Sequence, residues 1–131
     1  MEWIDPAQWK RKPLCDFFGE LDFPFFGVTF RVDMTGFYAR AKAAGLPIYY
    51  ATIYASMRAA NQIDPFLYKI RGKRIVRHPF LSPSFTAPAD DGLFKMVHVD
   101  WLPNESATEF CARVTEITDA QTNLLPNPED E

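Results

Sequence analysis

The segment Phe25–Val32 alternates aromatic and β-branched residues, which is the pattern typical of a β-strand. A strand needs neighbours, because its backbone N–H and C=O groups must find hydrogen-bond partners once they leave water. This segment therefore commits the chain to a fold that contains a sheet. The elements predicted around it decide the fold class.

Helix start and stop signals predict four helices. Proline suits a first helical turn, Ser106 and Glu109 form a capping box, and Gly45 is a typical C-terminal stop. The expected ranges are Pro13–Phe18 (stopped by Gly19), Gly36–Ala44 (capped by Asp33 or Thr35), Pro47 to about Asn61, and a last helix after Ser106 with Phe110, Val114 and Ile117 buried. In the third helix, Ala51, Ala55, Ala59 and Ala60 form a small-residue side that permits close packing.

Strand signals predict a hairpin and two further strands. Leu67–Ile70 and Arg74–Arg77 turn at Arg71-Gly72-Lys73, and their basic side chains indicate one solvated charged face. The further strands are Leu81–Ala87 and Phe94–Val99, with the turn Ala89-Asp90-Asp91-Gly92 between them; Pro79, Pro83 and Pro88 make the first of them short or an edge strand. The order of elements predicts an α/β or α+β two-layer fold. No strand follows the last helix, so a neighbouring chain could cover a free sheet edge.

Composition limits the classes of function. The 131 residues fit one domain, expected at 1–123, with 124–131 an acidic, proline-containing tail or a severed connector. A net charge of −3 gives no support for nucleic-acid binding. Cys15 and Cys111 match no metal-site spacing, so no metal is expected. Neither a signal peptide nor an apolar run of the ~20 residues that a membrane span needs is visible, which predicts a cytoplasmic protein with no membrane partner.

The residues alone do not assemble a catalytic set. His78 is expected to be an exposed loop residue at the end of a basic strand. His98 alternates with Val97 and Val99, and is interpreted as a cross-strand partner, a half-buried histidine or a general base. Asp90-Asp91 is expected to form a solvated turn. No nucleophile elbow, phosphate-binding loop or zinc-protease motif is present.

Several short motifs occur in a characteristic order. They are Trp9-Lys10-Arg11-Lys12, Phe17-Phe18, Asp33-Met34-Thr35 after the alternating segment, Asn61-Gln62-Ile63-Asp64, Ser84-Phe85-Thr86, and the helix Ser106–Asp119. In this order they resemble the N-terminal part of the chloramphenicol acetyltransferase family. The resemblance spans nearly the whole chain but only a little over half of a family member. It implies an incomplete CoA-dependent acyltransferase fold, because the family's catalytic His-His-x-x-x-Asp-Gly segment does not occur before Glu131.

The resemblance also implies roles for particular residues. Arg11 would be the arginine that pairs with the aspartate of the catalytic motif and supports that loop. The acceptor-binding residues would be Phe17, Phe18, Asp22, Pro24, Thr86 and Phe94. An aspartate at position 22 is a poor neighbour for a nitrophenyl ring, so the acceptor is expected to differ from chloramphenicol. Without the resemblance, the two phenylalanines would be interpreted as core residues and Arg11 as a solvated charge.

The implied function is acetyl transfer from acetyl-CoA to the hydroxyl of a small acceptor, which in this family serves antibiotic resistance. A histidine takes the proton of the hydroxyl, and a hydrogen-bond donor stabilises the oxyanion. Family members are trimers with active sites between subunits. Because this chain lacks the histidine, we expect it to be inactive alone. Its expected partners are the small hydroxylated acceptor and either further copies in a homotrimer or a completing C-terminal segment. The alternative is a non-enzymatic module that binds a ligand or forms oligomers.

Overall fold

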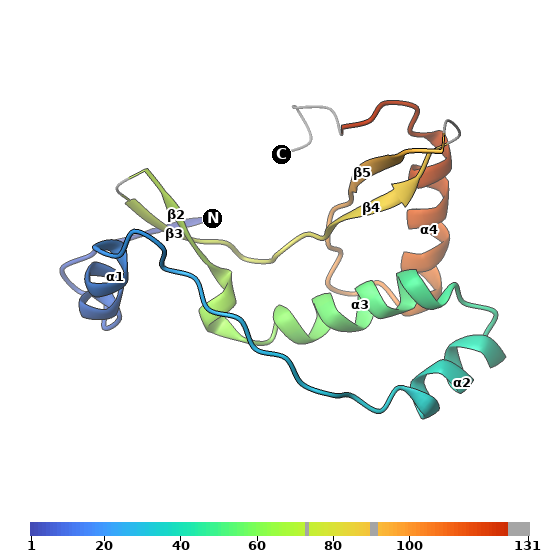
Figure 1. Ribbon diagram of the computed structural model, residues 1–131, viewed down its shortest axis with the longest axis horizontal. Coiled ribbons are helices and arrows are strands. Elements are labelled where there is room, and N and C mark those ends of the chain that lie inside the picture. Colours follow the sequence, from blue (N-terminus) through green and yellow to red (C-terminus); the bar gives the residue numbers. More distant parts are fainter. Residues whose placement is uncertain (73, 90–91, 126–131) are drawn as a thin grey trace.

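The computed structural model describes residues 1–72, 74–89 and 92–125 (Figure 1). The predicted hairpin turn at Lys73, the turn at Asp90-Asp91 and the tail from residue 126 onward fall wholly or partly outside the described residues. The described elements, in chain order, are β1 (Glu2–Ile4), α1 (Lys12–Gly19), α2 (Thr35–Ala43), α3 (Ile48–Ala60), the 3-10 helix η1 (Asp64–Leu67), β2 (Tyr68–Arg71), β3 (Arg74–Arg77), β4 (Ser84–Pro88), β5 (Phe94–His98) and α4 (Ala107–Ala120).

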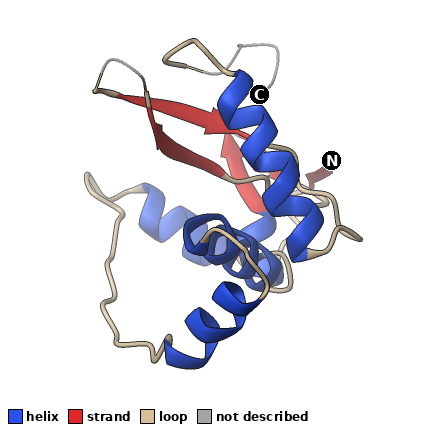
Figure 2. Ribbon diagram, turned by 90° about the vertical axis from the view of Figure 1, so that its right-hand side faces the viewer, coloured by secondary structure: helices blue, strands red, loops and turns tan. Residues whose placement is uncertain are grey.

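The main core lies between a β-ribbon and two helices. Strands β4 and β5 pair antiparallel, with Phe85 opposite Val97. Helices α3 and α4 cover one face of this ribbon, and α2 packs beside α3 (Figures 1 and 2). Phe110 and Val114 of α4 are fully buried in this core together with Val97. This mixed α/β arrangement confirms the predicted fold class, because apolar residues of one strand face and one helix stripe share a core.

A second, smaller sheet lies at the other end of the molecule. Its strand order is β1-β3-β2, and all pairs are antiparallel. The hairpin β2–β3 confirms the prediction, and Gly72 has the positive φ of +62° that such a turn requires. Strand β1 was not predicted. It is held by pairing with β3 and by the Arg74 guanidinium, which lies 3.8 Å from the centre of the Trp3 ring.

The helix ends follow the predicted signals closely. The Ser106 hydroxyl accepts from the Glu109 backbone N–H, and the Glu109 carboxylate accepts from the Ser106 backbone N–H at 2.8 Å, which completes the capping box. Gly45 ends α2 with a φ of +68°. Met34, rather than Asp33 or Thr35, occupies the N-cap of α2; the Asp33 carboxylate instead accepts from the Thr35 N–H.

The chain after α4 turns back along β5. The Lys95 ammonium donates to the carbonyls of Thr118 and Gln121, at 2.6 and 2.7 Å, where α4 ends. These carbonyls have no partner within the helix, so the ammonium satisfies groups that would otherwise need water. Beyond them, the backbone N–H of Met96 donates to the carbonyl of Leu124 at 2.8 Å.

The alternating segment is not a strand in this structure, so the prediction for residues 25–32 was wrong. Residues 20–36 are exposed without exception, and residues 23–34 belong to no helix or strand. They form a long extended connection from α1 to α2 (Figure 1). No strand of the described residues pairs with them. The physical reason is that alternation prepares a segment for a sheet but does not supply the neighbouring strand.

Two smaller expectations were also wrong. Of the small-residue side of α3, Ala51 is buried, but Ala55 and Ala59 are exposed. His78 is not an exposed loop residue: its side chain is half-buried, and its Nε2 atom is buried with no hydrogen-bond partner among the described residues. Its backbone N–H donates to the carbonyl of Leu67 at 2.8 Å, which ties His78 to the end of η1.

Candidate functional site

A groove of about 490 Å³ lies between α1 and the smaller sheet. Arg11, just before α1, and Phe18, near its end, both line it, so the structure brings these two predicted residues together. Phe26 of the exposed connection lines it too. The remaining lining residues are Trp9, Leu14, Cys15, Pro65, Tyr68, Lys69, Ile70 and Ile75. The groove therefore combines an apolar lining with two positive side chains.

The aromatic pair of α1 is open to solvent. The rings of Phe17 and Phe18 meet edge to face, with centroids 5.3 Å apart. The exposed fraction is 60% for Phe17 and 46% for Phe18. Pro13 begins the helix, and an ion pair between Lys12 and Asp16 spans its first turns. An exposed aromatic pair has apolar area available for a ligand or for another part of a fold.

The other predicted acceptor residues lie elsewhere. Asp22 and Pro24 are exposed in the connection that follows α1. Thr86 and Phe94 lie on β4 and β5, on the face of that ribbon that points away from the helices. Neither lines the groove beside α1. The six residues thus fall into two groups at different ends of the structure (Figure 1), and their joint role in one pocket stays a prediction.

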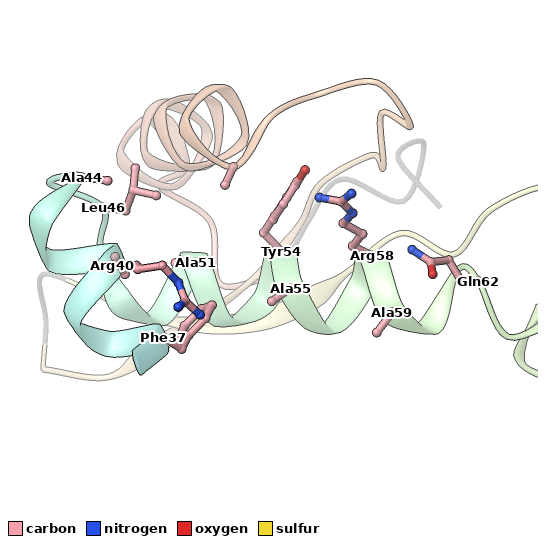
Figure 3. A pocket seen from close by; sticks show the side chains of 12 residues that line it. Phe37, Arg40, Ala44, Leu46, Ala51, Tyr54, Ala55, Arg58, Ala59 and Gln62 are labelled. Carbon is pink, nitrogen blue, oxygen red and sulfur yellow. The ribbon is translucent and has the colours of Figure 1, made fainter. Parts of the chain in front are cut away.

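A second cavity, of about 510 Å³, lies between α2, α3 and the beginning of α4. Figure 3 shows its side chains: Ala51, Ala55 and Ala59 lie along α3, and Arg40 and Arg58 come from two different helices. The other lining residues are Phe37, Ala41, Ala44, Leu46, Tyr54, Gln62 and Ala107. The Tyr54 hydroxyl already donates to the carbonyl of Glu105 at 2.8 Å, which fixes one wall.

The two arginines set the charge of this cavity. Within the part of the chain that the structure describes, neither guanidinium has a carboxylate partner. Unpaired guanidinium groups beside an apolar surface suit a ligand with an anionic group and an apolar body. The sequence analysis missed this cavity. The signal that pointed to it was the alanine series of α3, which was interpreted as a packing surface rather than as a wall.

The titratable residues of the smaller sheet are less suited to chemistry. Burial lowers the pKa of His78, and the positive charges of Lys69, Arg71 and the amino terminus lower it further. Burial also raises the pKa of the Cys111 thiol in the main core.

Among the described residues, no three His, Cys, Asp or Glu side chains gather where they would hold a metal ion. Nor is any helix in those ranges long and apolar enough to cross a bilayer.

Comparisons with known proteins place the fold. No family model matches the chain, and no curated protein matches its sequence. Among solved structures, one described as chloramphenicol acetyltransferase matches with a TM-score of 0.77 and 29% sequence identity. The match covers 99% of this chain and 58% of that chain, so this chain spans little more than half the length of its structural relative. The chain has the fold of the N-terminal portion of chloramphenicol acetyltransferase.

Proposed function

We propose that this chain forms the acceptor-binding side of a CoA-dependent O-acetyltransferase. The observation that carries the proposal is the fold match over 99% of the chain. The groove that Arg11 and Phe18 share supports it, because the resemblance assigns Arg11 to the support of the catalytic loop and Phe18 to the acceptor pocket. In this proposal, a small acceptor with a hydroxyl group lies against Phe17 and Phe18, and Asp22 and Pro24 border its pocket. Thr86 and Phe94 lie at the other end of this chain (Figure 1) and would reach the same pocket only from a neighbouring copy. A role in antibiotic resistance and a cytoplasmic location belong to the same proposal.

The catalytic base is the part that this sequence does not supply. Acetyl transfer needs a group that takes the proton from the acceptor hydroxyl. His78 is a poor base for this purpose, because its free ring nitrogen is buried and its surroundings are positive. His98 lies on β5 and lines neither of the two cavities described above. A histidine from a further segment would therefore complete the site, and Arg11 would pair with a carboxylate of that segment.

Acetyl-CoA is the proposed donor, and the cavity of Arg40 and Arg58 fits its chemistry. CoA carries phosphate groups at one end and a long pantetheine arm with methyl and methylene groups between its amides, and it would supply the activated acetyl thioester. The two unpaired guanidinium groups would hold the phosphates, and the alanine wall of α3 would accept the arm. These residues bind and orient the donor; they take no part in the proton transfer.

Calorimetric titration with CoA tests the donor site. We expect the double variant R40Q/R58Q to weaken CoA binding at least tenfold, since each charge-assisted phosphate contact is worth about 1.5–3 kcal/mol. R31Q is the matched control, because Arg31 lies in the exposed connection and lines neither cavity. Equal binding by R40Q/R58Q and R31Q would place the donor elsewhere.

An acetyl-transfer assay tests the function as a whole. The chain alone should show no turnover with a panel of hydroxylated acceptors, since a missing general base costs about 10²–10⁴-fold. Trimerisation of the chain alone should not change this, because every copy lacks the same base. Turnover by the purified chain alone that survives His98→Ala and His78→Gln would contradict the proposal that the catalytic base comes from a further segment.

The second candidate is a non-enzymatic module on the same fold. It is favoured by the main core, in which α3, α4 and the β4–β5 ribbon bury Phe110 and Val114 without any further segment. Binding of an acceptor or of CoA without turnover, even when a catalytic segment is provided, would favour this candidate over the enzyme.

A further inference from the structure

We propose that one face of the smaller sheet binds the phosphate or pyrophosphate group of a small soluble ligand between Arg71 of β2 and Arg74 of β3. The proposal goes beyond the proposed function and does not rest on it, since neither arginine lines either of the cavities described above. Three features of the molecule support it: the register of the sheet, the lack of ion pairs on this face and the charge of the whole chain.

The two arginines lie directly opposite one another. In the antiparallel pair β2–β3, Arg71 is the register partner of Arg74. Side chains at directly opposite positions project from the same face of a sheet, with Cβ atoms about 5 Å apart. Lys69 shares this face, because it lies two residues before Arg71 on the same strand. All three residues are exposed, so three positive side chains border one small area of surface.

Trp3 orders one of the two arginines. It is the register partner of Val76, which lies two residues after Arg74 on β3, so the Trp3 ring belongs to the same face. The Arg74 guanidinium lies 3.8 Å from the centre of that ring. Contact with an aromatic ring restricts a guanidinium, while its N–H groups stay able to donate to an anion. Arg74 is therefore held in place before a ligand binds.

This face lacks the ion pairs that would neutralise it. Within the part of the chain that the structure describes, no ion pair involves Lys69, Arg71 or Arg74. Arg77 lies on the opposite face of β3, where Asp64 is its partner. Like charges directly opposite each other destabilise a sheet. A bound phosphate would remove this repulsion, because its oxygens can accept hydrogen bonds from both guanidinium groups at once.

The imidazole of His78, just after β3, responds to the same charges. Burial lowers its pKa, and the positive charges of Lys69, Arg71 and the Met1 amino group lower it further. These charges therefore act on the ring without being cancelled by neighbouring carboxylates. An anion bound at Arg71 would offset part of the positive charge and raise the pKa of His78, so this ring reports on the occupancy of the face.

The charge of the chain as a whole favours a small ligand over a large polyanion. The net charge is −3, so the whole molecule does not attract a nucleic acid or an anionic membrane. At physiological salt, surface charges more than about 8 Å apart are largely screened from each other, and only the nearest positive side chains act on a bound anion. A phosphate or pyrophosphate group is small enough to contact both arginines within this range. A soluble phosphorylated molecule is therefore the occupant that this face fits.

Calorimetric titration with pyrophosphate at about 0.15 M salt tests the proposal. We expect R71Q and R74Q each to weaken the binding of pyrophosphate at least tenfold, since each removes a charge-assisted contact. R77Q is the matched control, because it removes one positive charge from the opposite face of the same hairpin, and it should change the affinity less than threefold. No binding by the unmodified chain, or equal weakening by all three variants, overturns the proposal. Binding to vesicles of phosphatidic acid without binding of pyrophosphate identifies a membrane surface as the occupant and also overturns it.

An NMR titration of the histidine rings tests the site without any substitution. Saturating pyrophosphate should raise the pKa of His78 in the unmodified chain, because it offsets the charge of Arg71 beside the ring. His98, on β5 in the other sheet, is the control, and its titration should not change. Binding of pyrophosphate that leaves the pKa of His78 unchanged would place the anion elsewhere and overturn the proposal, even if R71Q and R74Q weaken binding by altering the hairpin.

Discussion

Strand β4 and the extended connection from α1 to α2 have similar sequence patterns, but only β4 is part of a sheet. Ser84–Pro88 alternates between exposed and buried residues, with Phe85 and Ala87 in the core. Phe25–Val32 alternates just as regularly, yet it is exposed throughout. The difference is that β4 has β5 beside it and two helices beneath it. Alternation thus specifies which side chains a strand would bury, while the burial itself depends on partners distant in sequence.

The largest expected effect contrasts two phenylalanines. Phe110 is 0% exposed and has the rings of Tyr54 and Trp101 at 5.4 and 6.1 Å. Phe110→Ala should lower the free energy of unfolding by about 3–5 kcal/mol, which urea denaturation followed by circular dichroism would measure. Phe26→Ala in the extended connection should change it by less than about 0.5 kcal/mol. A comparable loss in both variants would show that the connection is packed against the rest of the chain.

An ion pair gives a smaller contrast. The Arg113 guanidinium donates to both carboxylate oxygens of Glu105, at 2.7 and 2.6 Å, and to the carbonyl of Asp100. Arg113→Met leaves the Glu105 carboxylate, whose side chain is 8% exposed, without this partner and should cost about 2 kcal/mol. Arg77→Met removes the more exposed pair with Asp64 and should cost clearly less. If urea denaturation shows a larger loss of unfolding free energy for Arg77→Met than for Arg113→Met, the ion pair of the smaller sheet stabilises the chain more than that of the main core.

The smallest expected effect is a pH dependence at His78. Because burial and nearby positive charges lower its pKa in the folded chain, the unfolded chain binds more protons there. Stability should therefore be unaffected well above the ordinary histidine pKa of about 6.5 and should fall as the pH drops below it. Denaturation at pH 7.5 and pH 5.5 measures the loss, which His78→Gln should reduce. His98→Gln is the control and should keep the loss due to His78; an equal reduction in both variants would contradict this assignment.

The sequence predicted the local parts of the fold well. The capping box at Ser106, the positive-φ glycines at 45 and 72 and the hairpin β2–β3 all depend on residues within a few positions of one another. Their signals are therefore contained in short windows. Val97 and Val99, which alternate with His98 in the sequence, are both buried.

The parts that the sequence did not predict depend on distant contacts. Strand β1 is only three residues long and exists through its register with β3, more than 70 residues later. The position of His78 depends on the bond from its backbone N–H to the carbonyl of Leu67, 11 positions earlier. Ala55 lines a cavity because no described element covers it. For the candidate site, the resemblance named Arg11 and Phe18 for two different roles, and only the structure shows that both line one groove. Arg40 and Arg58 are 18 positions apart and line one cavity only through the packing of α2 on α3.

The ammonium of Lys95 gives the main core a built-in chemical reporter. It is bound to two carbonyls at the end of α4 and is half-buried, so amine-reactive reagents reach it poorly while α4 lies against β5. Other lysines, such as Lys10 and Lys42, are exposed and should be modified at once. The rate at which Lys95 alone becomes labelled therefore measures how often the helix and the strand separate, without any engineered probe.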